Sequence, residues 1–303
     1  MGPDHLATAE PRGPADRHHV HALDARVLIE PIAGGPPPLD RRAAARAVEA
    51  NFVATWQLVA AAWDGELHDE GGLTWHAFRG PNDDPRATSV LRIALEDETA
   101  DVAVDELRGR FRARGLPAVW WTWRASRPAD IGARLRARGM EPWPAWPGMA
   151  MDLDALPPPP VHDDFAVRPV RSAAEFADVL TVLEPLGMRG IFAGAFQRLG
   201  DRDGWDDQQP FQHFVGRSAD GRPVASATLC TAGAAAGLYA VAVAEDARRR
   251  GYGRAVSLAA LQAGADAGHR FGVLQSSQMG FGVYRGIGLS LVCRLQAYED
   301  STG

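Results

Sequence analysis

The stretch 240–255, AVAVAEDARRRGYGRA, joins a strand pattern to a helix pattern through three arginines and two glycines. Alternating valines predict the strand, and small and apolar residues at helical spacing follow the glycines. The N-terminus of a helix leaves backbone N–H groups unpaired and carries partial positive charge, so it attracts phosphate. Gly251 and Gly253 have no Cβ and let a pyrophosphate approach the backbone. The stretch therefore predicts a phosphate-binding loop.

The spacing excludes two common kinds of phosphate loop. The nucleotide P-loop ends in lysine followed by serine or threonine, and this chain contains no lysine, so its 32 basic residues are all arginine. The dinucleotide fingerprint G-x-G-x-x-G fails because Val256 stands at its third glycine position. What remains is the pattern R-x-x-G-x-G, formed by Arg248, Gly251 and Gly253.

This pattern resembles the coenzyme A pyrophosphate loop of the GCN5-related N-acetyltransferase (GNAT) superfamily. Downstream, the segment QSSQMGFGVYRGIGLSLVCRLQAYE is similar to the closing Y-x-x-x-G-[FL] segment of that family, with Tyr284, Gly288 and Leu289 in place. A helix with a capping box at Ser172 and Glu175, a hairpin and a third strand precede the loop in the family's order. The resemblance covers about residues 165–300.

The resemblance implies acetyl-CoA as the cofactor and assigns residues to its parts. Backbone groups of the third strand would pair with the pantetheine arm, and N–H groups of the loop would hold the pyrophosphate beside the loop arginines. Tyr284 would protonate the departing thiolate, and a phenol near pKa 10 stays protonated at neutral pH while it can still donate. The implied cofactor-binding residues are Val241, Ala242, Val243, Arg248, Arg249, Arg250, Gly251, Tyr252, Gly253, Arg254, Ser276 and Ser277.

The chain departs from the family pattern at two points. Many members have an asparagine where this chain has Ser277, which would contact pantetheine more weakly. Many members also carry an acid on the third strand, and the stretch AAAGLYAVAV has none. Glu245 and Asp246 follow that strand as solvated charge, and His213 alternates with apolar residues as a core histidine. We expect either a water chain to act as base or the acceptor to arrive neutral.

The chain divides into two halves of similar pattern. Each half reads as strands, a helix, a strand, a short helix and a closing strand. Four consecutive prolines make a stiff extended spacer and cannot continue a helix or a central strand. The fold class is α/β (α+β), with two GNAT-like domains, each a mixed, mostly antiparallel sheet flanked by helices. The predicted parts are a flexible arm 1–38, a degenerate GNAT-like domain 39–155, a linker 156–164 and an acetyl-CoA-binding domain 165–303.

The first half lacks the phosphate motif. Its matching turn carries Glu96, Asp97 and Glu98, which would repel pyrophosphate. We expect this half to complete or buttress the acceptor cleft instead of binding coenzyme A. The acceptor pocket should involve residues 184–210, where Trp205 lies in an acidic run that either binds a cationic amine or is a solvated loop.

Composition narrows the function further. A net charge of −6 argues against general nucleic-acid binding, and no apolar run is long enough to span a membrane. The polar N-terminus lacks the apolar core of a secretion signal, and two cysteines suit a reducing compartment, so a cytoplasmic protein is expected. Three histidines at 18, 19 and 21 have no further ligands at metal-site spacing, so no metal is expected.

These observations predict an N-acetyltransferase that moves an acetyl group from acetyl-CoA to an amine by direct attack. The acceptor would be a small-molecule or peptide amine. Two alternatives stay open: a catalytically silent acyl-CoA-binding regulatory protein, and a tandem acetyltransferase of mycothiol-synthase type. The second would be expected to carry two cofactor loops, and the sequence has one.

Overall fold

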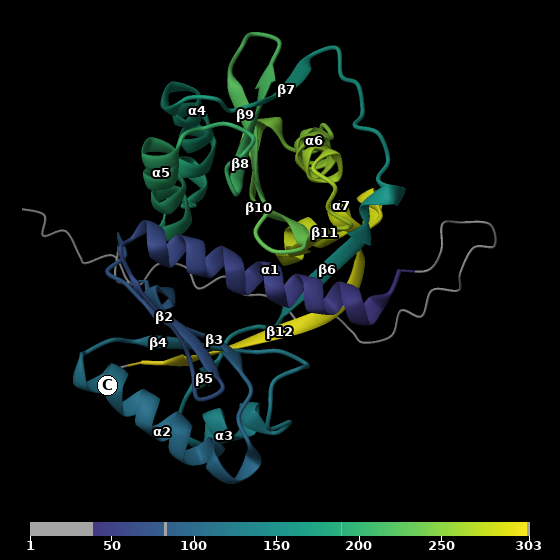
Figure 1. Cartoon of the computed structure of the whole chain (residues 1–303). Helices are drawn as coiled ribbons and strands as arrows, with labels where there is room; N and C mark the ends of the chain where they lie inside the picture. The colour runs from purple at the N-terminus through teal and green to yellow at the C-terminus, as the bar shows by residue number, and fades with distance from the viewer. Residues whose placement is uncertain (1–38, 82–83, 189, 302–303) are drawn as a thin grey trace, which may run out of the picture.

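The computed structural model describes residues 39–81, 84–188 and 190–301. Over these residues the chain forms seven α-helices around one twelve-stranded sheet (Figure 1). The N-terminal half contains α1 (Arg41–Ala62), β1 (Glu66–Glu70), β2 (Leu73–Ala77), β3 (Thr88–Ile93), α2 (Asp97–Ala113), β4 (Ala118–Thr122), α3 (Ile131–Ala137), β5 (Glu141–Pro142) and β6 (Trp146–Asp152).

The C-terminal half follows the extended linker. It contains β7 (Phe165–Pro169), α4 (Ala173–Leu183), α5 (Ile191–Asp203), β8 (Phe211–Ser218), β9 (Pro223–Cys230), β10 (Ala235–Val243), α6 (Tyr252–Asp266), β11 (Phe271–Gln275), α7 (Gln278–Ile287) and β12 (Ser290–Asp300). Most neighbours in the sheet are antiparallel, as expected. The exceptions among named strands are β10 with β11 and β3 with β4, which run parallel.

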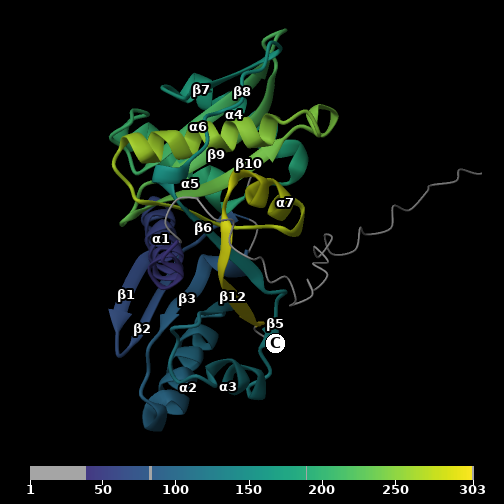
Figure 2. The same ribbon diagram turned by 90° about the vertical axis from the view of Figure 1, so that its right-hand side faces the viewer.

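The closing strands of the two halves are exchanged. The strand order is β1-β2-β3-β4-β12-β6-β11-β10-β9-β8-β7, with β5 also paired to β12. Thus β6 ends the first half of the chain but pairs with β11 of the second half. The last strand, β12, pairs with β6 and then with β4, and Figure 2 shows it running from one body of the molecule into the other. Strands from both sides of the linker 156–164 therefore share one sheet. The domain boundaries stay a prediction.

Helices cover both faces of this sheet. Helices α4 and α5 lie on one face of the C-terminal half and α6 on the other, while α2 and α3 cover the N-terminal half (Figure 1). Helix α1 crosses between the two halves and packs against α5, β6, β10 and β11. The indole Nε1 of Trp63, just after α1, donates to the Ile191 carbonyl at 3.2 Å, and the Arg198 guanidinium lies 4.5 Å from the Trp63 ring centroid.

Local signals in the sequence placed most elements correctly. Asp40 caps α1 by accepting from the amides of Arg42 and Ala43, and Ser172 caps α4 by accepting from the Glu175 amide. The sequence reading missed β1, whose five residues ELHDE are mostly charged and pair on one side only. A charged edge strand has no apolar alternation to reveal it.

The sequence also led to predictions about the N-terminal arm, metal binding, membrane spans and the cysteines. The predicted arm 1–38, with its three histidines, lies outside the described residues. Within the described ranges, no group of three or more His, Cys, Asp and Glu side chains is placed to hold a metal. None of the helices described has the length and apolarity needed to cross a bilayer. Both cysteines are free thiols.

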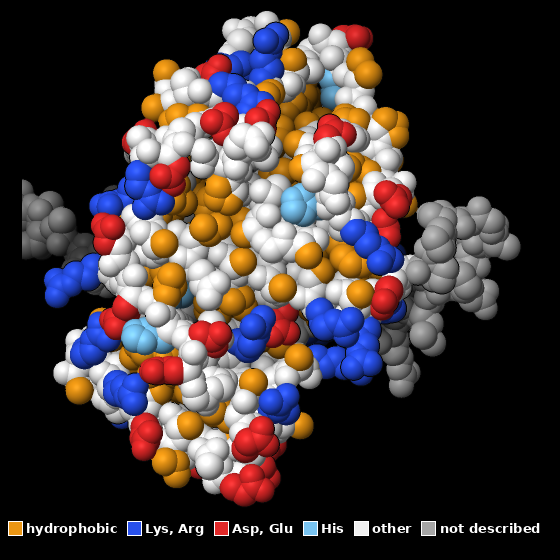
Figure 3. Space-filling model, viewed as in Figure 1, with side chains coloured by type: hydrophobic (Ala, Val, Ile, Leu, Met, Phe, Trp, Pro, Cys, Tyr) orange, Lys and Arg blue, Asp and Glu red, His pale blue; other side chains and the backbone are white. Residues whose placement is uncertain are grey.

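The surface in Figure 3 carries acidic and basic side chains interspersed over most of the face, with hydrophobic side chains between them. Nucleic-acid binding needs a continuous basic face or stripe instead. The expectation that the protein does not bind nucleic acid stays a prediction.

A buried ion pair fastens the exchanged strand β12 to α2, and its removal should destabilise the protein. Arg108 donates to both carboxylate oxygens of Asp300 at 2.8 and 2.9 Å, and the Asp300 side chain is 5% exposed. Asp300→Ala leaves a buried arginine without its partner, which costs about 3–5 kcal/mol of unfolding free energy. Thermal unfolding of Asp246→Ala is the control, since that carboxylate forms an exposed pair with Arg222. Equal melting temperatures for the two variants would contradict a structural role for Asp300.

Candidate functional site

The sheet opens between β10 and β11. The two strands pair only over Ala235–Gly237 and Phe271–Val273. Beyond that point β10 continues to Val243 beside β9 alone. The edge of β10 that faces the opening is therefore free to bind an extended group. The predicted pantetheine residues Val241, Ala242 and Val243 all lie on this part of the strand.

A bulge in β10 sets the shape of the opening. The register with β9 shifts between Tyr239 and Ala242, and Ala240 has a left-handed φ of 47°. A left-handed alanine costs roughly 1–2 kcal/mol, and such residues concentrate at functional sites. The bulge places Tyr239 and Ala240 together in the core cluster of the α1 face, while Val241 packs in the cluster of the α6 face. The two faces of the opening thus carry different side chains.

The loop predicted to bind phosphate lies at the start of α6. Arg249 and Gly251 have left-handed φ values of 64° and 86°, and α6 begins at Tyr252. The backbone amides of residues 249–254 donate no hydrogen bond to any residue that the structure describes. Unpaired amides at the positive end of a helix form an anion-binding concavity. This geometry fits the pyrophosphate of coenzyme A.

The four arginines of this segment differ in availability. Arg248 Nε donates to the Val243 carbonyl at 3.3 Å, and Arg254 Nη1 donates to the Gly286 carbonyl of α7 at 2.5 Å. Both side chains therefore brace the loop against its neighbours. Arg249 and Arg250 are exposed and form no ion pair with the described residues. The charge free to meet a phosphate comes from these two.

Tyr252 contributes its amide to the loop but not its side chain. Its hydroxyl donates to Asp164 at 2.8 Å and its ring stacks on Phe165 with centroids 4.1 Å apart. His162 lies edge-on to the same ring, and an added Cβ on Gly251 would come within 3.2 Å of it. The end of the linker and the start of β7 thus pack against the loop through Tyr252. This contact was not predicted from the sequence.

Tyr284, the predicted acid, lies on α7 beside the α6 face of the opening. Its ring packs so closely on Gly280 that a Cβ there would lie 2.8 Å from it. Burial raises the pKa of the Tyr284 phenol, so the hydroxyl stays protonated well above neutral pH. The hydroxyl makes no hydrogen bond to a residue in the described part of the chain. It is free to donate to a ligand.

The two serines before α7 have structural partners. The Ser277 hydroxyl accepts from the Gly280 amide at 3.1 Å and so caps α7, which leaves its proton free to donate. The Ser276 hydroxyl donates to the Ser277 carbonyl at 2.7 Å, and its amide donates to the Pro147 carbonyl. Ser277 therefore fits the predicted pantetheine contact, whereas the Ser276 proton is already in use.

The corresponding gap in the N-terminal half is closed. Strands β3 and β4 pair over only two residues each, but the chain after β4 folds back onto the edge of β3. The Trp123 indole donates to the Leu91 carbonyl at 2.9 Å, the Arg127 amide to the Ile93 carbonyl at 3.0 Å, and the Leu95 amide to the Arg127 carbonyl at 3.2 Å. An edge that is already hydrogen-bonded has no groups left for pantetheine. This closure supports the prediction that the first half does not bind coenzyme A.

Helix α1 places a polar group beneath the opening. Asn51 Nδ2 donates to the carbonyls of Cys230, Ala232 and Ala235 at 3.0–3.1 Å, and the Tyr239 hydroxyl donates to Asn51 Oδ1 at 2.8 Å. These bonds join residues 179–188 positions apart. Sequence reasoning missed the group because its only local signal is a polar Asn51 on the apolar stripe of α1.

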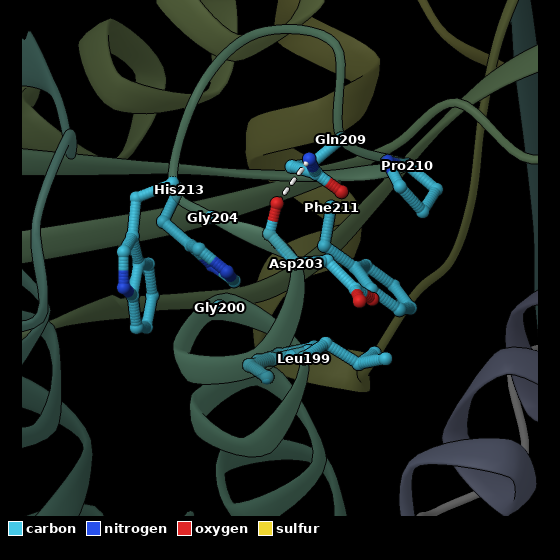
Figure 4. Close-up of a pocket in the computed structure, with 10 residues that line it drawn as sticks. Leu199, Gly200, Asp203, Gly204, Gln209, Pro210, Phe211 and His213 are labelled. Atoms are coloured by element: carbon cyan, nitrogen blue, oxygen red, sulfur yellow. Dashed lines mark hydrogen bonds between the residues drawn. The ribbon is translucent and has the colours of Figure 1, made fainter.

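The described part of the acidic segment predicted near the acceptor encloses one small cavity, and its part in an acceptor pocket stays a prediction. Trp205, His213 and neighbouring residues line a cavity of about 20 Å³, which holds about one water molecule (Figure 4). Asp203 pairs with Arg202 and its carbonyl accepts from Gln209, and Asp207 pairs with Arg171. Asp203 and Asp207 are therefore exposed and ion-paired.

His213 is a core histidine, as predicted. Its Nδ1 lies 2.9 Å from the Thr228 hydroxyl, and three aromatic rings surround it. Burial lowers the pKa of His213 to about 3, so the ring is neutral. Glu245 and Asp246 are exposed, again as predicted.

The model of the acetyltransferase (GNAT) family matches residues 187–280. A GCN5-related N-acetyltransferase from Kribbella flavida aligns with a TM-score of 0.66 at 17% identity, over 86% of this chain and 96% of its own. A tandem GNAT protein of the clavulanic acid biosynthesis pathway aligns with a TM-score of 0.59 at 12% identity, over 88% of this chain and 96% of its own.

A third structure, a GCN5-related N-acetyltransferase from Sphaerobacter thermophilus, aligns with a TM-score of 0.55 at 15% identity, over 88% of this chain and 93% of its own. At these identities the structures establish the fold. No curated protein was found to match the chain by sequence.

The close approach of α1 to the opening depends on Gly237. An added Cβ there would lie 1.9 Å from Asn51 Oδ1, so Gly237→Ala forces α1 away and should cost about 1–3 kcal/mol of stability. Gly109→Ala is the matched control, because nothing lies within 4 Å of that position in α2 and alanine favours helix. Chemical denaturation should show the first variant destabilised and the second unchanged or stabilised. Equal behaviour would show that α1 does not dock through Asn51.

Proposed function

We propose that the chain is an acetyl-CoA-dependent N-acetyltransferase, because the acetyltransferase (GNAT) family model matches residues 187–280 and a tandem GNAT protein is similar in fold. The observation that supports this most is the combination of an open β10 edge with unpaired amides at the start of α6. The open edge of β10 presents backbone N–H and C=O groups, and the amides at the start of α6 attract phosphate. Acetyl-CoA would supply an acetyl thioester at this place.

Each residue group has a part in holding the cofactor. The amides of residues 249–254, with the exposed Arg249 and Arg250, are suited to the pyrophosphate. The edge of β10 from Val241 to Val243, which pairs with no second strand, is suited to the amides of pantetheine. The free proton of the Ser277 hydroxyl is suited to the same arm. Binding at these groups would hold the thioester in the opening, where orientation supplies much of the rate.

Tyr284 would act as the general acid. Its phenol is protonated, unpaired within the described chain and on the face where the cofactor loop lies. A proton donor placed at the sulfur helps the thiolate to leave. Backbone N–H groups at the bulge of β10 are suited to stabilise the developing negative charge on the acyl oxygen.

One observation favours a second candidate, a silent acyl-CoA-binding protein: β10 carries no carboxylate. The protonated, unpaired Tyr284 speaks against it, because a binding module has no use for a proton donor at the thioester. A mycothiol-synthase-type enzyme would be expected to use two cofactor sites, and the closed gap between β3 and β4 speaks against that reading. Thiol release from acetyl-CoA with a panel of amines separates transferase from binder. Tight acetyl-CoA binding without release for any amine would reject the transferase.

Tyr284→Phe should lower kcat about 10²–10⁴-fold, the range typical of a lost general acid. The dissociation constant for acetyl-CoA should change little, because the ring that packs on Gly280 remains. Burial raises the pKa of Tyr284, so its phenol stays protonated as the pH rises. The wild-type rate should therefore show no loss from deprotonation of Tyr284 between pH 7 and pH 10. Steady-state kinetics with calorimetric binding test both points. Unchanged kcat in the variant would exclude the acid role.

Gly251→Asp should abolish acetyl-CoA binding. The left-handed φ of 86° disfavours any side chain, and a carboxylate beside the loop repels phosphate. Gly109→Asp is the control for the added charge, since it faces open space far from the loop. Calorimetry should show wild-type affinity for the control and none for Gly251→Asp. Retained affinity in the latter would move the cofactor site elsewhere.

A further inference from the structure

The face of the opening turned away from the cofactor loop offers a hydrogen-bond acceptor of fixed orientation. The Asn51 carboxamide donates to three carbonyls, so its oxygen must point to Tyr239. The Tyr239 hydroxyl gives its only proton to that oxygen at 2.8 Å. Toward any other group Tyr239 can therefore only accept. A ligand that meets it must bring an N–H or O–H donor.

The surroundings of Tyr239 are uncharged. Asn51 accepts from its hydroxyl, and Thr55, Cys230 and Gln275 lie near it. Phe192 stacks near its ring with centroids 6.1 Å apart and planes 20° from parallel. Burial raises the pKa of the Cys230 thiol to about 11, so it is neutral at pH 7. Gln275 lies on β11 at the other side of the opening, and its Nε2 is buried without a hydrogen-bond partner among the described residues.

Part of this neutral surface is exposed, while Asn51, Thr55 and Cys230 are buried. Tyr239, Ala240, Gln275 and Phe192 are half-buried, although the strands that carry two of them lie in the middle of a twelve-stranded sheet. Helix α1 carries one carboxylate, Glu49, and it is paired with Arg92 at 3.1 Å. Of the acids near α5, Asp203 is paired with Arg202 and Asp207 with Arg171. An ammonium group brought to Tyr239 would lose its water without gaining a counter-charge, which is strongly unfavourable.

Proton balance leads to the same conclusion. Acyl transfer forms a C–N bond and breaks a C–S bond, and the thiolate needs one proton. A neutral amine must lose one proton in the reaction, which matches that need. An ammonium must lose two and requires a base for the first. Among the residues that the structure describes, none of the side chains next to Tyr239 is such a base.

We infer that the acyl acceptor is a neutral, weakly basic amine on an aromatic or apolar body, and that Tyr239, oriented by Asn51 from the other half of the chain, accepts a hydrogen bond from its N–H. This inference rests on the proposed acetyltransferase function. Tyr239 is then a specificity-determining residue, and Phe192 provides an aromatic wall for the acceptor ring.

The test compares aniline with benzylamine, which differ by one methylene but are neutral and protonated, respectively, at pH 7. With wild-type protein and saturating acetyl-CoA, kcat/KM for aniline should be level between pH 7 and pH 9. The value for benzylamine should rise about tenfold per pH unit, because the neutral fraction of an alkyl amine grows in that way below its pKa. A pH-independent kcat/KM for benzylamine that exceeds that for aniline would overturn the inference and leave the transferase standing. Thiol release with no amine would reject both.

Tyr239→Phe tests the residue. The KM for aniline should rise about 3- to 10-fold, the equivalent of one hydrogen bond, with acetyl-CoA affinity unchanged. Tyr298→Phe is the matched control, because its hydroxyl contacts Arg136 in the N-terminal half. An unchanged KM for aniline in a Tyr239→Phe protein that still binds acetyl-CoA would overturn the role of Tyr239. The wild-type amine comparison does not depend on this variant folding.

Discussion

The opening between β10 and β11 depends on the exchange of the two closing strands. When β10 leaves β11, the latter keeps a full ladder on its other side only because β6 arrives from the first half of the chain. Strand β12 in turn holds β6 and reaches β4, where Arg108 binds the buried Asp300. Among the described strands, the sheet keeps one open gap, between β10 and β11. Its free edges are held rigid by partners that belong to the other half.

The same exchange explains why the two halves differ. Both contain a pair of parallel strands that separate after two or three residues. In the first half Trp123 and Arg127 fill the gap with hydrogen bonds, and the following turn is acidic. In the second half a left-handed Ala240 widens the gap, and a glycine loop with free amides follows. The first half therefore supports the opening: β6 pairs with β11, and α1 packs against β10 and β11.

Much of the second half was readable from the sequence because its signals are local. A capping serine, an Asp-Gly turn and the spacing of Arg248, Gly251 and Gly253 each determine structure within a few residues. The exchange of β6 and β12 was not readable, since both are apolar strands and any neighbour in a sheet satisfies that pattern. The contact between Asn51 and Tyr239 spans 188 positions and has no signature in either segment. The arginines were readable as a group, but only the structure separates the two that brace the loop from the two that are free.

The central claim is that one half of the chain holds the cofactor while the other half closes the equivalent gap. Isothermal titration of the full chain with acetyl-CoA measures this directly through its stoichiometry. The account predicts one molecule bound per chain. Two molecules per chain would show that the gap between β3 and β4 opens after all, and no binding would contradict the assignment of the loop at residues 248–254.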